Sequence, residues 1–502
     1  MESPAGSRNG RAFLIVGLVL AMAMLLLNPA RFKEIDEYNL FWLTDSLAAG
    51  KGFTIHQGLL IGSRTGRGNQ FFYGKQGAQG FYSPYGPLLS IAYLPYHGLG
   101  RLLGCVLALT PVQQELLLWL LAIAFNSMLF LCLYCVLWRM AAPGFSPVCI
   151  ALLLLSSPLV YYAQSFYAEI LLCLLLVLAY LAMEHGKACL AGCLVGLALL
   201  TKISAIIFLP LFCLYLFYHH RESIRRLLRA GGAFVGPVAA GLLAYAWYNL
   251  YRFGSIFTFG YPQTDEFGQQ MNVLVANPWP GLQTLLFSPG KGVFVYFPVG
   301  LFFLLTLLRK NERTPAALFI LGCLVVPIVF FSFWLHYEGG TCFGPRFLLV
   351  SMAFVLLFLV NRLPRAGKRV RVAICLLAAA GMAVNLPACL VHFSRVALFD
   401  GLDYYVSREG AYNRAFSPFT GIFRRLARDL DHLQTGPCAM TYDVPMAYVS
   451  TFELFCLGEG LDLAPLPLLK SGIKWRLAPI LFAAFLLILW PVFWVYLKQR
   501  PG

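Results

Sequence analysis

Long apolar runs recur along almost the whole of this 502-residue chain, and they constrain its fold more than any other feature. A helix needs about 20 consecutive apolar residues to cross a bilayer. Only 12% of the residues are charged, against about 25% in a typical soluble domain. The sequence therefore predicts an all-α, polytopic membrane protein. We expect about twelve transmembrane helices (eleven to thirteen), at 12–29, 115–138, 146–162, 165–183, 188–200, 203–218, 231–250, 292–308, 316–335, 347–361, 372–392 and 476–497.

Two stretches leave the number of crossings open. The runs 188–200 and 203–218 are short and are separated only by Thr201 and Lys202, so they form either two short spans or one broken helix. Ser83–Leu109 is also apolar, but several prolines and glycines interrupt it. A crossing there would invert the sides of the later loops, so we interpret it as an interfacial or re-entrant element, with backbone groups satisfied by protein or water.

The distribution of charge predicts the orientation of the chain. The net charge is +16, but the termini and the short basic loops hold 18 Lys and Arg against 4 Asp and Glu, whereas the remainder holds 20 against 18. Short loops rich in Lys and Arg face the cytoplasm. The positive excess is thus a topology signal rather than a nucleic-acid interface, and nearly all carboxylates lie on the outer side.

The first long loop, Arg31–Gly52, carries the Asp36-Glu37 pair close to the end of the first apolar run. After the pair, aromatic and polar residues alternate up to Gly50 and Gly52, and glycine commonly ends helices. We expect a helix lying on the membrane surface with both carboxylates at its N-terminal end. Asp36 can equally be only an N-cap, a role that aspartate fills well.

The domain organisation follows from these runs. Residues 1–392 form the main transmembrane module, in which 30–111 is the first outer loop. Residues 393–475 form an extracytoplasmic segment, and 476–502 the last transmembrane helix and a cytoplasmic tail. Most of the 14 cysteines lie in or beside apolar runs. Cys438 and Cys456 fall on the outer side and can pair, but spacing alone does not decide it.

Three cations stand at predicted helix starts on the outer face: Lys202, Lys291 in Phe287–Gly292, and Arg346 at the end of Gly339–Arg346. Helix N-termini attract anions through free N–H groups and the helix dipole, and arginine binds phosphate through two donors. This pattern predicts a phosphate or pyrophosphate site. Alternatively, Lys291 and Arg346 simply extend to lipid headgroups.

Other ionisable residues add to this outer site. Glu169 is the only carboxylate within a predicted span, where such groups are costly and usually functional. It either pairs with Lys202 or lines the cavity. His336 and Glu338, beside aromatic residues, can bind a metal ion or sugar hydroxyls. An exposed carboxylate pair, cationic helix ends and aromatic loops on one side fit group transfer from a lipid phosphate.

Short motifs in chain order resemble the membrane glycosyltransferases of the GT-C class, and more narrowly the bacterial family-39 type related to protein O-mannosyltransferases and aminoarabinose transferases. Each motif is short, and the ordered set over about residues 30–350 carries the resemblance. The matching pieces are Asp36-Glu37 with Leu47-Ala48, Tyr82–Leu88, Ser157-Pro158 with Glu169, Gly196–Lys202, Tyr248-Asn249 with Arg252–Gly254, Ser288–Gly292, Gly339-Gly340 and Gly344–Phe347.

The resemblance implies a GT-C fold, a polyprenyl-phosphate sugar donor and an inverting displacement at the outer face of the plasma (inner) membrane. Carried onto this chain, it makes Asp36 the catalytic base, with Glu37 in reserve. The donor phosphate is contacted by Lys202, Arg346 and Lys291. We expect Glu169, Tyr82, Tyr85, His336 and Glu338 to be candidate substrate contacts.

Departures from the family pattern leave the acceptor open between lipid, glycan and protein. A single proline stands on each side of Tyr85-Gly86 instead of a Pro-Pro pair, and the tail is short. Nothing in the sequence requires a cofactor, although Asp36, Glu37 and Glu338 can hold a divalent cation such as Mg²⁺ or Mn²⁺. The alternatives to an enzyme are a transporter or flippase for a polyprenyl-linked substrate and a structural envelope subunit. Transporters often contain repeated halves, and none is visible here.

Overall fold

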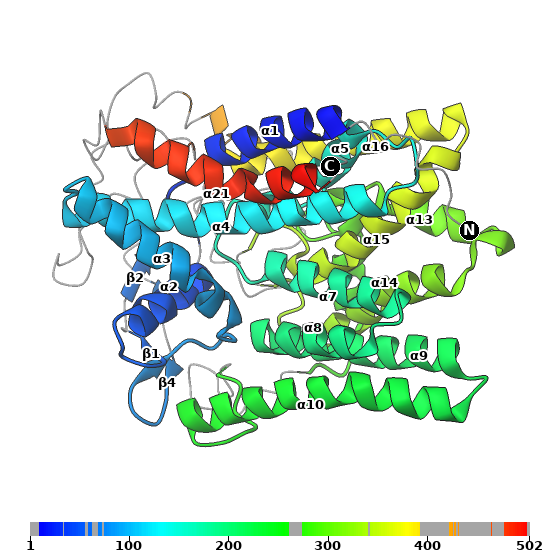
Figure 1. Cartoon of the computed structure of the whole chain (residues 1–502), viewed down its shortest axis with the longest axis horizontal. Coiled ribbons are helices and arrows are strands. Elements are labelled where there is room, and N and C mark those ends of the chain that lie inside the picture. Colours follow the sequence, from blue (N-terminus) through cyan, green and yellow to red (C-terminus); the bar gives the residue numbers. More distant parts are fainter. Residues whose placement is uncertain are drawn as a thin grey trace.

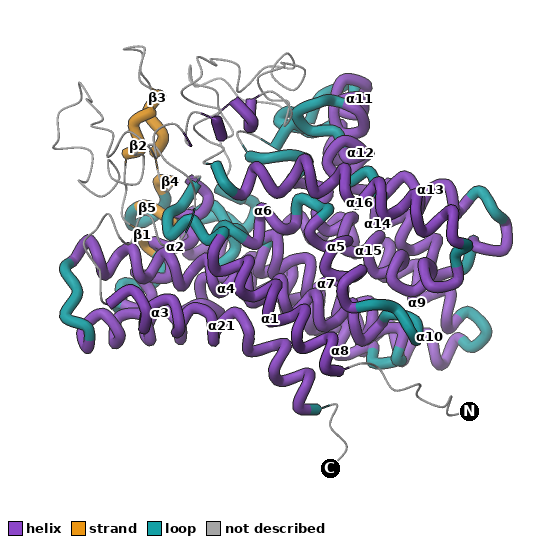
Figure 2. Tube along the Cα trace, turned by 90° about the horizontal axis from the view of Figure 1, so that it is seen from above, coloured by secondary structure: helices purple, strands orange, loops and turns teal. Residues whose placement is uncertain are grey.

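The structure is a computed structural model that describes residues 10–33, 35–55, 59–62, 69–72, 75–260, 274–339, 342–391, 421–424, 426, 427, 430, 463 and 476–498. In this part of the chain, helices run roughly parallel across the molecule (Figure 1). The strands gather at one edge, away from most of the helices (Figure 2). The predicted segment 393–475 and its cysteines Cys438 and Cys456 lie almost entirely outside the described residues.

The prediction of an all-α polytopic membrane protein is confirmed, because each of the twelve predicted spans coincides with one or more helices. Among the described residues, seven helical segments are long and apolar enough to cross a membrane. They comprise α4 (Pro111–Met140), η1 (Ile203–Phe208) with α9 (Leu209–His220), α10 (Ile224–Phe253), α14 (Pro315–Ser332), η3 (Arg346–Leu348) with α15 (Leu349–Arg362) and η4 (Leu363–Arg365), α16 (Lys368–Cys389), and α21 (Leu477–Leu497).

The other five predicted spans correspond to shorter or interrupted helices. They are α1 (Gly10–Leu26), α5 (Pro147–Leu155) with α6 (Leu159–Ala163), α7 (Glu169–Glu184), α8 (Ala188–Thr201), and α12 (Val293–Tyr296) with α13 (Gly300–Leu307). Each interruption contains a proline, Pro158 between α5 and α6 and Pro298 between α12 and α13, and proline lacks the N–H that continues a helix. Two further short elements outside the first outer loop are η2 (Lys310–Glu312) and α11 (Trp279–Phe287).

Helix α4 is the centre of the bundle. In its most apolar 18-residue stretch, 94% of the residues are buried inside the protein, as expected for a helix that is hydrophobic on all sides. Its start is fixed by a capping box, in which the Thr110 side chain accepts from the Gln113 backbone N–H while the Gln113 side chain accepts from Thr110. Helices α1, α3 (Leu88–Val106), α7 and α21 pack around it. By contrast, only 17% of the residues in the most apolar stretch of α10 are buried. Its Leu243 and Trp247 are exposed on the outside of the bundle.

Among the described elements, α8 and α10 make the most extensive helix–helix contact, and glycine permits it. A Cβ added to Gly192 would lie 2.2 Å from the Phe234 carbonyl oxygen, and one added to Gly241 would lie 2.6 Å from the Gly196 Cα. Small residues of this kind let membrane helices approach closely. This contact fixes the position of Lys202, which directly follows the end of α8.

The described part of the first outer loop, 30–111, forms a separate layer over one end of the bundle (Figure 1). It contains α2 (Ile35–Ala48), α3 (Leu88–Val106) and five short strands that the sequence did not predict. The strands β1 (Thr54–Ile55) and β4 (Lys75–Gln76) both pair antiparallel with β5 (Phe81–Tyr82), and β2 (Leu59–Gly62) pairs with β3 (Asn69–Phe72). Runs of two to four residues carry too little alternation to be recognised in a sequence.

The structure also refines the interpretation of Ser83–Leu109. The segment contains one continuous 19-residue helix, α3, despite Pro95 in its interior. Helix α3 packs against α2 and α4 and is absent from the seven segments that meet the criteria for a membrane span. Both observations agree with an element lying at the interface.

Candidate functional site

Polar side chains from five separate segments meet at the end of the bundle covered by α2. Asp36 comes from the first turn of α2, Tyr85 from the loop before α3, and Glu169 from the first residue of α7. Lys202 stands between α8 and η1, and Arg346 begins η3. Together these five residues form what we call the Asp36 cluster.

Arg346 is the central residue of the Asp36 cluster. Its Nη2 lies 2.5 Å from Asp36 Oδ2, and its Nε lies 2.6 Å from Glu169 Oε1. The Lys202 Nζ lies 2.7 Å from that same glutamate oxygen. The Tyr85 hydroxyl donates to Asp36 Oδ1. Two carboxylates and two cations thus balance in charge, and Glu169 does form the pair with Lys202 that the sequence raised as one alternative.

Accessibility differs within the Asp36 cluster. The Asp36 side chain is 18% exposed, whereas Glu169 is 4%, Arg346 9% and Lys202 10% exposed. Asp36 is therefore the carboxylate that another molecule can reach. In the described residues, its oxygens bond to Tyr85 and Arg346 and not to a backbone N–H of α2. The N-cap alternative for Asp36 is accordingly wrong.

Glu37 points away from Asp36 and holds the backbone. It is fully buried. Its Oε1 accepts from the Lys33 backbone N–H at 2.9 Å and its Oε2 from the Phe166 N–H at 2.6 Å. Because Phe166 lies just before α7, this carboxylate ties the start of α2 to the segment that carries Glu169. The geometry gives Glu37 a positioning role and leaves Asp36 as the candidate base.

Lys291 lies beside the Asp36 cluster and is connected to it through Cys342. The Lys291 side chain is buried, and its Nζ donates to the Cys342 carbonyl oxygen. The Cys342 Sγ accepts from Arg346 Nη1 at 3.0 Å and lies 3.2 Å from the Tyr167 hydroxyl. Lys291 and Arg346 thus turn inward rather than extending to lipid headgroups. The sequence analysis gave no role to Tyr167, or to Cys342 within Gly339–Arg346, because its anion-site pattern rests on lysine and arginine alone.

Arg252 positions Tyr85. The guanidinium is fully buried and stacks 3.7 Å from the centre of the Tyr248 ring. Its Nη2 donates to Asn249 Oδ1 at 2.6 Å, and its Nη1 donates to the Ser83 carbonyl oxygen. The sequence contained this residue in a motif but gave it no role. Its place at the end of an apolar helix, where burying a charge requires strong partners, was the available signal.

Gly86 allows the Tyr85 loop to reach the end of α8. A Cβ at this position would lie 2.1 Å from the Leu200 carbonyl oxygen. The loop before α3 can therefore contact the segment that presents Lys202 only with glycine at this position. Tyr82, by contrast, is fully buried against Tyr251 and Phe253, so it packs the loop rather than facing a substrate.

His336 and Glu338 form a second, more exposed pair. His336 Nδ1 lies 3.4 Å from Glu338 Oε1, with the histidine 40% exposed. The hydrogen bond to Glu338 raises the pKa of His336 above its usual value. Within the described residues, no group of three or more His, Cys, Asp or Glu side chains could hold a metal ion. In particular, Glu37 is turned away from Asp36, so these two do not form a chelating pair.

The chemistry open to the Asp36 cluster combines a base with an anion site. A partly exposed carboxylate can accept a proton from a hydroxyl group. Arg346, Lys202 and Lys291 can neutralise negative charge that develops on an oxygen nearby. Arg346 and Lys202 are already paired with carboxylates. A phosphate that binds here must therefore take over some of those contacts.

Comparison with known proteins places the chain near glycosyltransferases. Residues 93–332 match the model of glycosyltransferase family 87. The matched stretch holds Glu169, Lys202 and Lys291, whereas Asp36 and Arg346 lie outside it. The match agrees with the resemblance to glycosyltransferases found in the sequence motifs. No curated protein matches the sequence.

Two crystal structures of ArnT from Cupriavidus metallidurans are similar to this structure. The apo form is 14% identical with a TM-score of 0.46, covering 97% of this chain and 76% of the ArnT chain. The form bound to undecaprenyl phosphate is 15% identical with a TM-score of 0.45, covering 95% and 76% respectively.

Proposed function

We propose that this chain is an integral-membrane glycosyltransferase that moves a sugar from a polyprenyl-phosphate donor to an acceptor hydroxyl at the outer face of the plasma membrane. The carrying observation is the Asp36 cluster. It joins one partly exposed carboxylate to two cations, and a third cation lies beside it. The match of residues 93–332 to a glycosyltransferase family supports the same reaction class.

The reaction is a single displacement. The acceptor oxygen attacks the anomeric carbon and forms the new glycosidic bond, while the bond from that carbon to the phosphate oxygen breaks. The electron pair of this bond leaves with the polyprenyl phosphate, next to Arg346 and Lys202. The acceptor proton passes to the Asp36 carboxylate. One displacement inverts the anomeric configuration.

The positions of the charges agree with this order of events. Arg346 contacts both Asp36 and Glu169, so a phosphate bound to its guanidinium lies next to the candidate base. Arginine suits this role because its planar fork binds two oxygens of one phosphate. Tyr85 holds the other oxygen of Asp36 and fixes the direction in which the carboxylate faces.

The decisive experiment compares Asp36→Asn with a matched control on the same helix. Asp45 lies in α2 but bonds to His97 and Arg101, outside the Asp36 cluster. We expect Asp36→Asn to reduce transfer from a radiolabelled polyprenyl-phosphate sugar by about 10²–10⁴-fold, the usual contribution of a general base. Asp45→Asn should keep transfer within about threefold, because a side chain remote from the chemistry changes no proton-transfer step. Equal losses in both variants would refute Asp36 as the base.

A flippase for the same class of lipid is the alternative function. The cations would then bind the phosphate, but no sugar would be transferred. The native chain distinguishes the two functions directly. Reconstituted protein that moves labelled donor across vesicles without transferring sugar to any lipid, glycan or protein acceptor would replace the enzyme by a transporter.

A further inference from the structure

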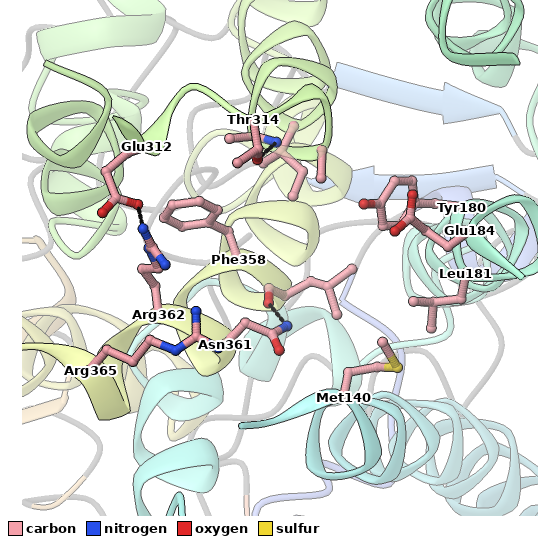
Figure 3. Close-up of a pocket in the computed structure, with 14 residues that line it drawn as sticks. Met140, Tyr180, Leu181, Glu184, Glu312, Thr314, Phe358, Asn361, Arg362 and Arg365 are labelled. Atoms are coloured by element: carbon pink, nitrogen blue, oxygen red, sulfur yellow. Dashed lines mark hydrogen bonds and ion pairs between the residues drawn. The ribbon is translucent and has the colours of Figure 1, made fainter. Parts of the chain in front are cut away.

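A second charged site lies at the opposite end of the bundle, where nothing in the proposed reaction acts. Two cavities open there. One, of about 320 Å³, lies between the ends of α4, α7, α14 and α15 (Figure 3). Its lining includes Glu184 and Glu312 as well as Arg362 and Arg365, and Glu312 pairs with Arg362. Because both signs of charge are present, this cavity does not select an anion.

The other cavity is lined by basic side chains without a carboxylate. It has a volume of about 750 Å³ and lies between the start of α8, the end of α9 and the start of α10. Lys187, His220, Arg226 and Arg229 line it. In the described part of the chain, none of these four forms an ion pair; the nearby Glu184 pairs instead with His219, outside this cavity. We call these four residues the basic pocket.

The packing of α8 on α10 explains why the basic pocket is open. The helices touch at Gly192, Gly196 and Gly241, one to two turns further into the bundle. The walls nearer the helix starts are small residues, including Ala188, Ala230 and Ala233. Both helices also begin here, so the positive ends of their dipoles reinforce the field of the side chains.

The apolar surroundings indicate that the occupant has hydrocarbon chains. Leu190 lines the cavity and is 47% exposed, and Val235, just beyond it on α10, is 53% exposed. A phosphate held at the basic pocket would thus have apolar surface beside it along the bundle. Basic pockets between helices on the cytoplasmic side are suited to anionic lipid headgroups, and the positive-inside rule assigns this end to the cytoplasm.

We propose that the basic pocket binds the phosphate of an anionic phospholipid of the inner leaflet, with its acyl chains along the exposed faces of α8 and α10. This site is independent of the sugar-transfer reaction. A general attraction of positively charged ends to membranes would spread over all the basic loops. At a specific site, lipid binding would instead depend on the four residues of the basic pocket.

Two exposed cysteines provide the measurement. Cys189 and Cys193 line the basic pocket. The internal reference is Cys375, which is exposed on α16 about two turns from the start of that helix. The full chain is purified in detergent and titrated with phosphatidylglycerol or phosphatidylcholine. The rate of maleimide modification is then read for each cysteine by peptide mass spectrometry. We expect phosphatidylglycerol to protect Cys189 and Cys193 but not Cys375, and phosphatidylcholine to protect none.

Matched variants test the charge. Arg226→Gln with Arg229→Gln removes two charges from the basic pocket. Arg369→Gln with Arg371→Gln removes two from the exposed start of α16, predicted to be on the same side. The first pair should need at least about tenfold more phosphatidylglycerol for the same protection, since each basic residue near the surface contributes to anionic-lipid attraction. The second pair should change it less than about threefold because its charges lie outside the pocket. Lys187→Gln is the replacement if the first pair does not fold.

Three results would overturn the lipid site. Equal protection by phosphatidylcholine would indicate nonspecific coverage of the helices. Equal weakening in both pairs of variants would indicate general attraction to a basic face. Protection by millimolar inorganic phosphate alone would assign the pocket to a soluble anion.

Discussion

Two neighbouring carboxylates, Asp36 and Glu37, have different surroundings although they are chemically alike. Asp36 is partly exposed and paired with Arg346, whereas Glu37 is buried and accepts two backbone N–H groups. The sequence predicted Asp36 as base and Glu37 as its reserve. The sequence could not separate their roles, because one of the two N–H groups that donate to Glu37, that of Phe166, is 129 positions away.

Because of these different surroundings, we expect one isosteric substitution to lower mainly the stability of the protein and the other to lower mainly its transfer activity. Glu37→Gln turns one accepting oxygen into a donor facing a buried N–H, so it should lower the free energy of unfolding by about 1–3 kcal/mol. Asp36→Asn should have a smaller effect on unfolding while reducing transfer by about 10²–10⁴-fold. Thermal unfolding in detergent, measured beside the transfer assay, checks both. A Glu37→Gln protein of native stability would refute its positioning role.

Arg252 allows a further test at the residue scale. Lysine at this position keeps the charge but cannot hold Asn249 and the Ser83 carbonyl through one planar group. We expect Arg252→Lys to shift Tyr85 and thereby lower kcat of transfer by about tenfold, since small misplacements of catalytic groups cost rate. Tyr85→Phe should produce a similar loss. If Arg252→Lys unfolds the protein while Tyr85→Phe leaves kcat intact, Arg252 is structural only.

At the scale of the element, α2 and α3 are held together by Asp45. Its Oδ1 lies 2.6 Å from Arg101 Nη2 and 3.3 Å from His97 Nε2, both on α3. The hydrogen bond from His97 and the contact with Arg101 lower the pKa of Asp45 below its usual 3.8. A carboxyl whose pKa is depressed by folding stabilises the folded state above its unfolded pKa and loses that contribution as pH falls through the folded value.

Asp45→Asn should therefore destabilise the protein at pH 7 but not at a pH below the folded pKa of Asp45, which lies under 3.8, because the native carboxyl is then protonated as well. The measurement is the difference in unfolding temperature between the native and variant proteins at the two pH values. A difference that stays constant with pH would mean that packing, and not the charge of Asp45, joins the two helices.

Elements also divide into those that the sequence predicts and those that it does not. Apolar runs located the ends of the long predicted spans to within about four residues, except the start of α10, which lies seven residues before the predicted 231, because hydrophobic length is a local property. The contact of α8 with α10 depends on Gly192 and Gly241, which are far apart in sequence. Likewise, Lys202 and Arg346 were identified as anion-binding residues from their positions at helix starts. Their convergence on one oxygen of Glu169 required the packing of three helices.

At the scale of the whole molecule, exposed cysteines mark both ends of the bundle. Cys105 lies at the end of α3 in the first outer loop, whereas Cys189 lies at the start of α8, at the opposite end. The predicted orientation makes Cys105 reactive toward a membrane-impermeant maleimide in intact cells and Cys189 reactive only after lysis. The labelling pattern is read in variants that keep one of these cysteines each. The reverse pattern would place the Asp36 cluster in the cytoplasm.

The pairing of Asp36 with Arg346 has a kinetic consequence for the proposed reaction. With no donor bound, the guanidinium masks the base, so an acceptor or water arriving first meets a carboxylate that is already engaged. A phosphate that takes the guanidinium releases the carboxylate at the moment when the sugar is in place. The order of substrate addition would thus be built into one ion pair, with the donor entering before the acceptor.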